Sequence, residues 1–219
     1  MTTILHLDTS ARTLDKSRSK HNSISRTLAD SFREQWQKKI SETEVIYRDL
    51  GANPPDFISE SWISAVFTPD EQRTTEQNAL LSLSDELIDE VIKADIILLS
   101  TPMYNYGMPA VLKAWFDQVI RVNKTFTFDL SRGDFPLEPI LSGKTMVLIA
   151  SCGEFGFHVG GVREKMNHLG PHVEVASQYL GIEKFYEIRS EYQEFDDQRH
   201  IKSLNYAHTE IKNLISQLT

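Results

Sequence analysis

The chain has 219 residues, of which 40% are hydrophobic and 25% charged, a composition typical of a soluble globular protein and long enough for a sizeable core. Its net charge of −8 argues against a nucleic-acid partner, since no run of Lys or Arg could neutralise phosphates. The single cysteine, Cys152, excludes an internal disulfide framework. With no secretory signal and no apolar run long enough to span a bilayer, we expect a cytoplasmic protein without a membrane partner.

The first half of the chain predicts two strands, one helix and a long loop. Residues 3–8 form a short strand, and residues 20–39 form an amphipathic helix. The apolar stripe of this helix consists of Ile24, Leu28, Phe32 and Trp36. A second strand covers 44–50, and the proline-bearing residues 52–76 are expected to form a loop with one or two helical turns.

The second half continues the alternation of helices and buried strands. Residues 95–100 are apolar throughout, as expected of a strand that is covered on both sides. The connection over 125–142 is long for a loop between a helix and a strand, and loops of this length are usually functional. The other elements are helices over 77–94, 109–122 and 171–181, strands over 144–151 and 184–190, and a C-terminal helix.

Strands that alternate with helices predict βαβ units, and hence a single α/β domain over residues 1–219 with a parallel sheet covered by helices on both faces. For five strands with right-handed crossovers, the leading arrangement is the flavodoxin-like order 2-1-3-4-5. Ligands bind such sheets outside the carboxyl ends of the strands, at the switch point between the first and third strands. We therefore expect a binding site built from the loops after the first, third and fourth strands.

The loop after the first strand carries hydroxyl groups close to the start of the first predicted helix. Ser10, Ser17 and Ser19, together with the free amides of a helix N-terminus, suit a phosphate monoester. The loop contains neither a Walker motif nor a dinucleotide fingerprint, because it has no glycine. The alternative is that Ser17 or Ser19 only caps the helix.

The loop after the third strand, "TPMYNYGMP" over 101–109, places two tyrosines and an amide between prolines. A flat heteroaromatic ligand requires an aromatic or apolar wall and a few fixed donors and acceptors at its edge. Tyr104, Asn105 and Tyr106 can supply both. The alternative is that the tyrosines only cover the core.

The loop after the fourth strand begins "SCGEFG", and its two glycines let the backbone approach a ligand closely. The hydroxyl of Ser151 and the amides of Gly153 and Glu154 could bind a pyrimidine-like edge. The alternative is an ordinary connection between a strand and a helix.

Three motifs in these loops resemble those of the FMN-dependent NADH-azoreductases, which are also quinone reductases. The most specific is "PMYNYGMPAVLKAWFDQVIRVNKTFTF" over 102–128, and Ser10 with "SRS" at 17–19 and "SCGE" at 151–154 match more loosely. The resemblance implies an FMN-dependent enzyme that passes electrons from NAD(P)H to quinones and azo compounds by a ping-pong mechanism. It requires no catalytic side chain, and it implies a homodimer with active sites at the subunit contact.

In that family the serine loop holds the FMN phosphate, and the other two loops hold the isoalloxazine ring. The resemblance therefore implies phosphate contacts from Ser10, Ser17, Arg18 and Ser19. It implies ring contacts from Met103, Tyr104, Asn105, Tyr106, Ser151, Cys152, Gly153 and Glu154. It also favours the substrate pocket for Phe126, for which the alternative is a place in the core.

The third motif departs from the family's commonest form, Ser-Arg-Gly-Gly, at Cys152 and Glu154. A carboxylate facing the ring would oppose formation of an anionic reduced ring, so Glu154 is expected to use its amide and to direct its side chain into solvent. No basic cluster near Cys152 favours a catalytic thiol. The histidine spacings match no zinc signature, so we expect no metal.

A second hypothesis is an electron-carrier flavodoxin that docks on partner proteins, which the acidic charge would suit. The long 125–142 segment and the aromatic wall argue against it, because a carrier needs an exposed flavin edge. Aromatic residues in long loops favour the homodimer instead, since aromatics anchor interfaces: Trp62, Phe67, Phe126 and Phe128. The acidic stretch over 191–197 is expected to be a solvated turn before the last helix.

Overall fold

The computed structural model describes residues 1–17 and 22–219, and its centre is a sheet of five parallel strands in the order β2-β1-β3-β6-β7. These strands are β1 (Thr2–Asp8), β2 (Thr43–Asp49), β3 (Ile96–Pro102), β6 (Lys144–Ser151) and β7 (Ile182–Ser190). The predicted order 2-1-3-4-5 is confirmed, because the labels differ only by two short strands that lie outside this sheet.

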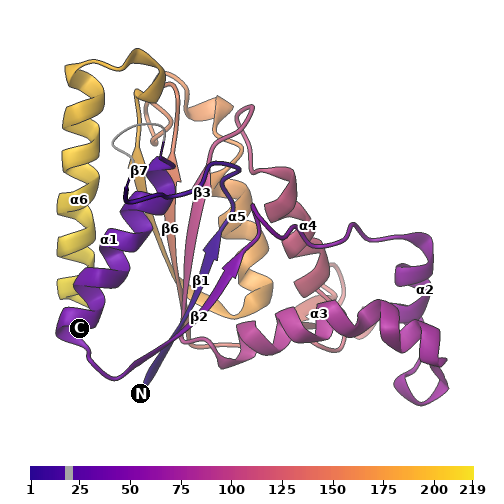
Figure 1. Cartoon of the computed structure of the whole chain (residues 1–219). Coiled ribbons are helices and arrows are strands. Elements are labelled where there is room, and N and C mark those ends of the chain that lie inside the picture. Colours follow the sequence, from indigo (N-terminus) through magenta and orange to yellow (C-terminus); the bar gives the residue numbers. More distant parts are fainter. Residues whose placement is uncertain (18–21) are drawn as a thin grey trace.

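Helices cover both faces of the sheet (Figure 1). On one face lie α1 (Ile24–Lys39) and α6 (Gln198–Leu218), and on the other lie α3 (Thr75–Lys93), α4 (Ala110–Val119) and α5 (Gly170–Ser177). Successive side chains of a strand point to opposite faces, so each buried strand feeds two cores. Ile97 and Leu99 of β3 therefore pack under α3 and α4, whereas Ile96 and Leu98 pack under α1 and α6.

The predicted loop over 52–76 contains the helical turns that its sequence indicated. Helix α2 (Glu60–Phe67) begins after Ser59, whose side chain accepts a hydrogen bond from the amide of Trp62, and a short 3-10 turn follows. The Trp62 side chain is only 8% exposed, since it forms a small separate cluster with Ala65 and Leu81. This burial leaves Trp62 poorly placed to anchor a partner subunit.

The sequence suggested that the long connection over 125–142 is a loop, but it contains regular structure. It contains β4 (Phe126–Phe128) and β5 (Leu137–Pro139), which pair antiparallel with each other. Phe126 pairs with Pro139, and its ring meets that of Tyr179 edge to face at 5.6 Å. Strands of three residues carry too little alternation to be recognised in a sequence.

The two ends of the sheet carry different parts of the chain (Figure 1). Because all five strands run in the same direction, the loops after β1, β3 and β6 gather at the carboxyl end, while the N- and C-termini lie at the opposite end. Within the described residues, no helix combines the length and the apolar character needed to cross a bilayer.

Candidate functional site

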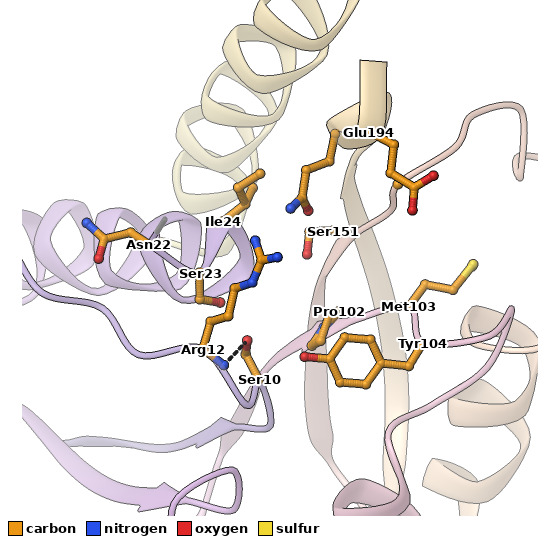
Figure 2. Close-up of a pocket in the computed structure, with 12 residues that line it drawn as sticks. Ser10, Arg12, Asn22, Ser23, Ile24, Pro102, Met103, Tyr104, Ser151 and Glu194 are labelled. Carbon is orange, nitrogen blue, oxygen red and sulfur yellow. Dashed lines mark hydrogen bonds between the residues drawn. The ribbon is translucent and has the colours of Figure 1, made fainter. Parts of the chain in front are cut away.

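The loops after β1, β3 and β6 surround a cavity of about 280 Å³ at the carboxyl end of the sheet (Figure 2). It is lined by Ser10, Arg12, Asn22, Ser23, Ile24, Pro102, Met103, Tyr104, Ser151, Gly153, Gln193 and Glu194. A neighbouring hollow of about 340 Å³ shares Met103, Gly153 and Glu194 with it. Asn105, Tyr106, Glu154 and Phe157 complete the second lining.

The structure brings together most of the residues that the sequence selected. Eight of them line the two hollows: Ser10, Met103, Tyr104, Asn105, Tyr106, Ser151, Gly153 and Glu154. Ser17, Cys152 and Phe126 are not in either lining. Arg18 and Ser19 lie outside the described residues.

One end of the cavity is suited to an anion. Ser10 is only 3% exposed, and its side-chain oxygen accepts a hydrogen bond from the amide of Arg12 at 3.1 Å, which leaves its own proton available. The Arg12 side chain extends into the cavity (Figure 2). Helix α1 begins at the same place with no acidic residue in its first turn, so its amide dipoles add to the positive potential.

The residue that caps α1 differs from the two serines considered above. Ser23 is the cap, because its side-chain oxygen accepts a hydrogen bond from the amide of Arg26, and α1 begins at Ile24. The hydroxyl of Ser17 donates instead to the carboxylate of Asp15 at 2.6 Å. Several serines precede this helix, and propensity alone does not choose among them.

The loop after β3 forms a tight turn with an unusual backbone. The amides of Tyr104 and Gly107 each donate to the other's carbonyl at 3.0 Å, and the residues between them have φ of 48° at Asn105 and 66° at Tyr106. Left-handed backbone is costly for an aromatic residue and accumulates at ligand sites. The carbonyl of Tyr106 is held by the amide of His168 at 2.9 Å. The turn is therefore fixed, with the Tyr104 ring directed at the cavity (Figure 2).

The stretch over 191–197 is a turn before α6 with Glu194, Phe195 and Asp196 exposed, as expected, but it also bonds to the loop after β6. The amide of Gln193 donates to the carbonyl of Cys152 at 3.2 Å, and that of Glu194 to the carbonyl of Gly153 at 3.0 Å. A Cβ on Gly153 would stand 2.7 Å from the Glu194 side chain, so a larger residue there would displace that side chain.

The sequence analysis therefore missed Gln193 and Glu194, along with Arg12, Asn22 and Ser23. The aromatic residues around 191–197 were an available signal, because the rings of Phe155 and Tyr192 stack at 4.5 Å and fasten the stretch to the third loop.

The Glu154 side chain does not project freely into solvent, contrary to expectation. One carboxylate oxygen accepts a hydrogen bond from the Tyr106 hydroxyl at 3.1 Å, and the other pairs with Arg163 at 2.9 Å. The hydrogen bond and the negative charge raise the pKa of Tyr106. Glu154 thus joins the second and third loops, and Arg163 offsets its charge.

Cys152 is 1% exposed, and burial raises the pKa of its thiol to about 12. A protonated, inaccessible thiol is neither a nucleophile nor a metal ligand at neutral pH. In the part of the chain that the structure describes, no three His, Cys, Asp or Glu side chains are grouped to hold a metal ion.

The chemistry of the lining fits a flavin mononucleotide. Ser10, Arg12 and the start of α1 offer hydroxyl, guanidinium and amide donors for a terminal phosphate at one end. Met103 and Tyr104 offer an apolar and aromatic wall for a flat ring at the other end.

Comparisons with known proteins agree with this geometry. The profile of a family described as having a flavodoxin-like fold matches residues 2–213. FMN-dependent NADH:quinone oxidoreductase 2 of Colwellia psychrerythraea is 65% identical over 218 residues, covering 100% of both chains. A protein of the same name from Idiomarina loihiensis is 58% identical over 219 residues, covering 100% of this chain and 91% of that one.

Among solved structures, an FMN-dependent NADH-azoreductase from Bacillus anthracis in complex with FMN superposes with a TM-score of 0.84 at 18% identity. The match covers 100% of this chain and 99% of that one. At this identity the likeness shows the shared fold.

Proposed function

Because the chain belongs to the family of FMN-dependent NADH:quinone oxidoreductases with a flavodoxin-like fold, we propose that it binds FMN and transfers electrons from NADH to quinones and azo compounds. The observation that carries this proposal is a cavity at the carboxyl ends of β1, β3 and β6 with an anion-binding end and an aromatic wall. A bound FMN would supply the redox chemistry, hydride uptake from NADH and two-electron transfer to the acceptor.

The phosphate end of the site is formed by Ser10, Arg12 and the first amides of α1. Ser10 would donate a hydrogen bond from its hydroxyl to the phosphate, and Arg12 would add a charge-assisted contact. Ser17, with Arg18 and Ser19 outside the described residues, is assigned to this end by family resemblance. Arg12 is added to the set because it extends into the cavity.

The ring end is formed by the two loops that Glu154 joins. Met103 and Tyr104 provide the wall, while Asn105 and Tyr106 with Ser151 and Gly153 provide edge donors and acceptors. Cys152 is assigned to this end by family resemblance alone, since it lines neither hollow and its amide and carbonyl are bonded to Ser190 and Gln193. The charge of Glu154 is acceptable beside the ring because Arg163 is paired with it.

No side chain in the site has to act as a general acid. The protons that convert a quinone to a hydroquinone come from NADH, through the hydride, and from water. NADH and the acceptor would bind one after the other at the same side of the flavin, which corresponds to a ping-pong mechanism. Phe126 lies on the β4–β5 pair and is proposed to contact substrate.

We assign the active unit to a homodimer in the cytoplasm. Phe67 and Phe128 are 74% and 54% exposed, and aromatic residues are enriched among the anchors of protein interfaces. Two-fold pairing is the commonest closed symmetry.

Titration of the purified, flavin-free chain with FMN, followed by an assay of NADH oxidation with a quinone as sole acceptor, tests the function. We expect FMN to bind more tightly than FAD. We also expect the double-reciprocal plots for NADH and quinone to give parallel lines. Binding of FMN without oxidation of NADH would identify an electron carrier instead, and no binding of FMN would refute the proposal.

A further inference from the structure

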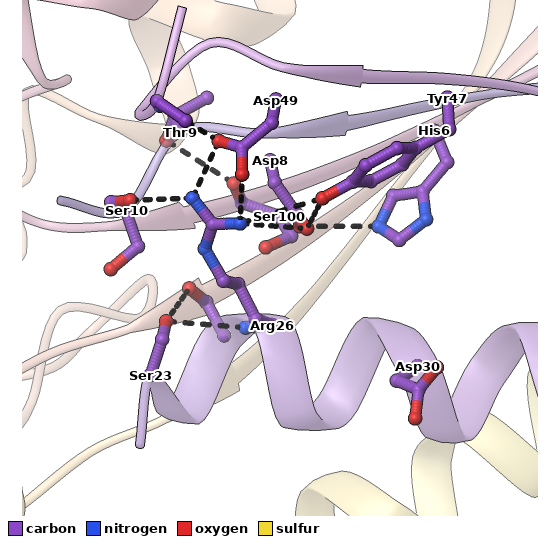
Figure 3. A network of polar contacts seen from close by, with 12 residues as sticks. His6, Asp8, Thr9, Ser10, Ser23, Arg26, Asp30, Tyr47, Asp49 and Ser100 are labelled. Atoms are coloured by element: carbon purple, nitrogen blue, oxygen red, sulfur yellow. Dashed lines mark hydrogen bonds and ion pairs between the residues drawn. The ribbon is translucent and has the colours of Figure 1, made fainter. Parts of the chain in front are cut away.

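Arg26 lies behind the cavity, in the first turn of α1, and lines neither hollow of the site. Its side chain is 5% exposed, and its guanidinium joins three segments of the chain (Figure 3). Both terminal nitrogens donate to the carboxylate of Asp49 at 2.6 Å, at the end of β2. One also donates to the carbonyl of Ser10 at 2.7 Å, and the other to the Asp8 carboxylate at 3.3 Å.

Gly51 confines the Ser10 carbonyl from another direction. The amides of Leu50 and Gly51 donate to the carbonyl of Asp8 at 2.8 and 3.2 Å, which brings the chain after β2 against the loop after β1. A Cβ on Gly51 would stand 2.2 Å from the Ser10 carbonyl oxygen and 2.9 Å from a terminal nitrogen of Arg26. The carbonyl therefore has little room to move.

The fixed carbonyl belongs to the residue that begins the anion-binding end. The Ser10 side chain is bonded to the amide of Arg12 at 3.1 Å, so the position of the Ser10 backbone also sets that of Arg12. These two residues present a hydroxyl and a guanidinium to the cavity. A shift of the Ser10 carbonyl would move both donors.

We propose that Arg26 is a positioning residue for the phosphate end of the site: it holds Ser10 and Arg12 in place and touches neither the phosphate nor the ring. The proposal rests on the proposed binding of FMN. Lysine cannot replace Arg26, because one ammonium cannot span both Asp49 oxygens and the Ser10 carbonyl in one plane.

The test compares FMN with riboflavin, which has the same ring but no phosphate. Dissociation constants of both ligands are measured by quenching of flavin fluorescence for the wild-type chain, Arg26→Lys and Arg26→Gln. We expect the affinity for FMN to fall about 10- to 100-fold, the loss expected for one hydrogen bond to a charged group. The affinity for riboflavin should change less than about twofold, because riboflavin has no phosphate to lose a hydrogen bond.

Arg48→Gln is the matched control. Arg48 precedes Asp49 in β2, and it pairs with two carboxylates, Glu86 and Glu90 of α3, away from the loop after β1. Its removal should leave both affinities as in the wild type, and this separates the effect of Arg26 from the loss of any other arginine–carboxylate pair next to the sheet.

Gly51→Ala tests the same loop with Arg26 intact, and it decides the matter should an Arg26 variant fail to fold. We expect the same selective loss of FMN affinity, with folding checked by circular dichroism. Equal losses for FMN and riboflavin would show a general packing role and overturn the proposal, as would unchanged FMN affinity. A wild-type chain that binds riboflavin but not FMN would refute the proposed function instead.

Discussion

Ser10 presents a buried hydroxyl at the anion-binding end of the cavity, where its partner would be a charged phosphate. We expect Ser10→Ala to weaken FMN binding by about 1.5–3 kcal/mol, the usual contribution of a hydrogen bond to a charged group. Isothermal titration with FMN measures the loss. Ser82→Ala, on an exposed part of α3, is the control and should bind FMN as the wild type does. An unchanged affinity for Ser10→Ala would place the phosphate elsewhere.

The thiol of Cys152 should be inert in the folded chain. Its pKa is raised to about 12 by burial, so it remains protonated at pH 8, and it is 1% exposed. We expect no reaction with a disulfide reagent at pH 8 until denaturant is added, and then one thiol per chain. Cys152→Ala should retain NADH–quinone activity. Rapid labelling of the native chain, or loss of activity in the variant, would contradict a buried thiol without a part in catalysis.

At the scale of elements, we expect a substitution in the turn over 104–107 to change the affinity for FMN without changing the stability of the fold. Asn105 has φ of 48°, a conformation that glycine adopts freely, so Asn105→Gly should keep the free energy of unfolding within about 1 kcal/mol of the wild type. FMN affinity should fall, because the side-chain amide at the ring edge is lost. Chemical denaturation and FMN titration measure the two effects.

Asn123→Gly is the matched control, since Asn123 has φ of 61° and is absent from both linings of the site. It should change neither stability nor FMN affinity by much. A parallel loss of affinity in both variants would mean that Asn105 has no contact of its own with the flavin.

The ion pairs that join β2 to α1 predict a dependence of stability on pH. Burial raises the pKa of Asp49, but hydrogen bonds from Arg26 and from the amide of Ala52 lower it by more. The net pKa is therefore below the ordinary value. A depressed carboxyl pKa stabilises the fold above the unfolded value of about 4, and this contribution is lost as the pH falls through the folded pKa.

Denaturation measured between pH 6 and pH 2 should therefore show a smaller decline in the free energy of unfolding for Asp49→Asn than for the wild type, from a lower starting value. Asp134→Asn, on an exposed segment, should reproduce the wild-type profile. If the free energy of unfolding of Asp49→Asn declines with falling pH as steeply as that of the wild type, other carboxylates control the loss of stability in acid.

The elements differ in how far the sequence predicts them. β6 was predicted to the residue, and β3 within one residue at its start and two at its end, because a continuous apolar run is typical of a strand buried on both faces. The start of α1 was predicted too early, since Ser23 competes with other serines for the cap. The contacts of 191–197 with the third loop were missed, because its amides bond to Cys152 and Gly153, about forty residues away, and only its aromatic residues signalled them.

The same contrast holds within the site. Tyr104 and Asn105 were found because their motif is local and unusual for a loop. Arg26 was not, because its function depends on Asp49 and Ser10, which only the fold brings within reach. Long-range polar contacts of this kind leave no periodic pattern in a sequence.

At the scale of the whole molecule, we expect the active protein to be a dimer. Light scattering of the FMN-loaded chain should give twice the mass of 25.1 kDa, and NADH–quinone activity should fall with the dimer fraction on dilution. In Phe67→Asp and Phe128→Asp, the mass and the activity should both begin to fall at a higher protein concentration, because each substitution places a charge on an exposed apolar site. Tyr206→Asp, on the outer helix α6, is the control. A fully active monomer would refute a shared site.

Both chain ends lie at the amino end of the sheet (Figure 1). The residues that line the cavity lie at the carboxyl end. A tether fused to either terminus therefore leaves from the side opposite the flavin-binding loops. On an electrode or a bead, such a chain presents its cavity to the solution, where NADH and quinone arrive by diffusion. The polarity of a parallel sheet thus makes either end of this chain a suitable attachment point for a supported catalyst.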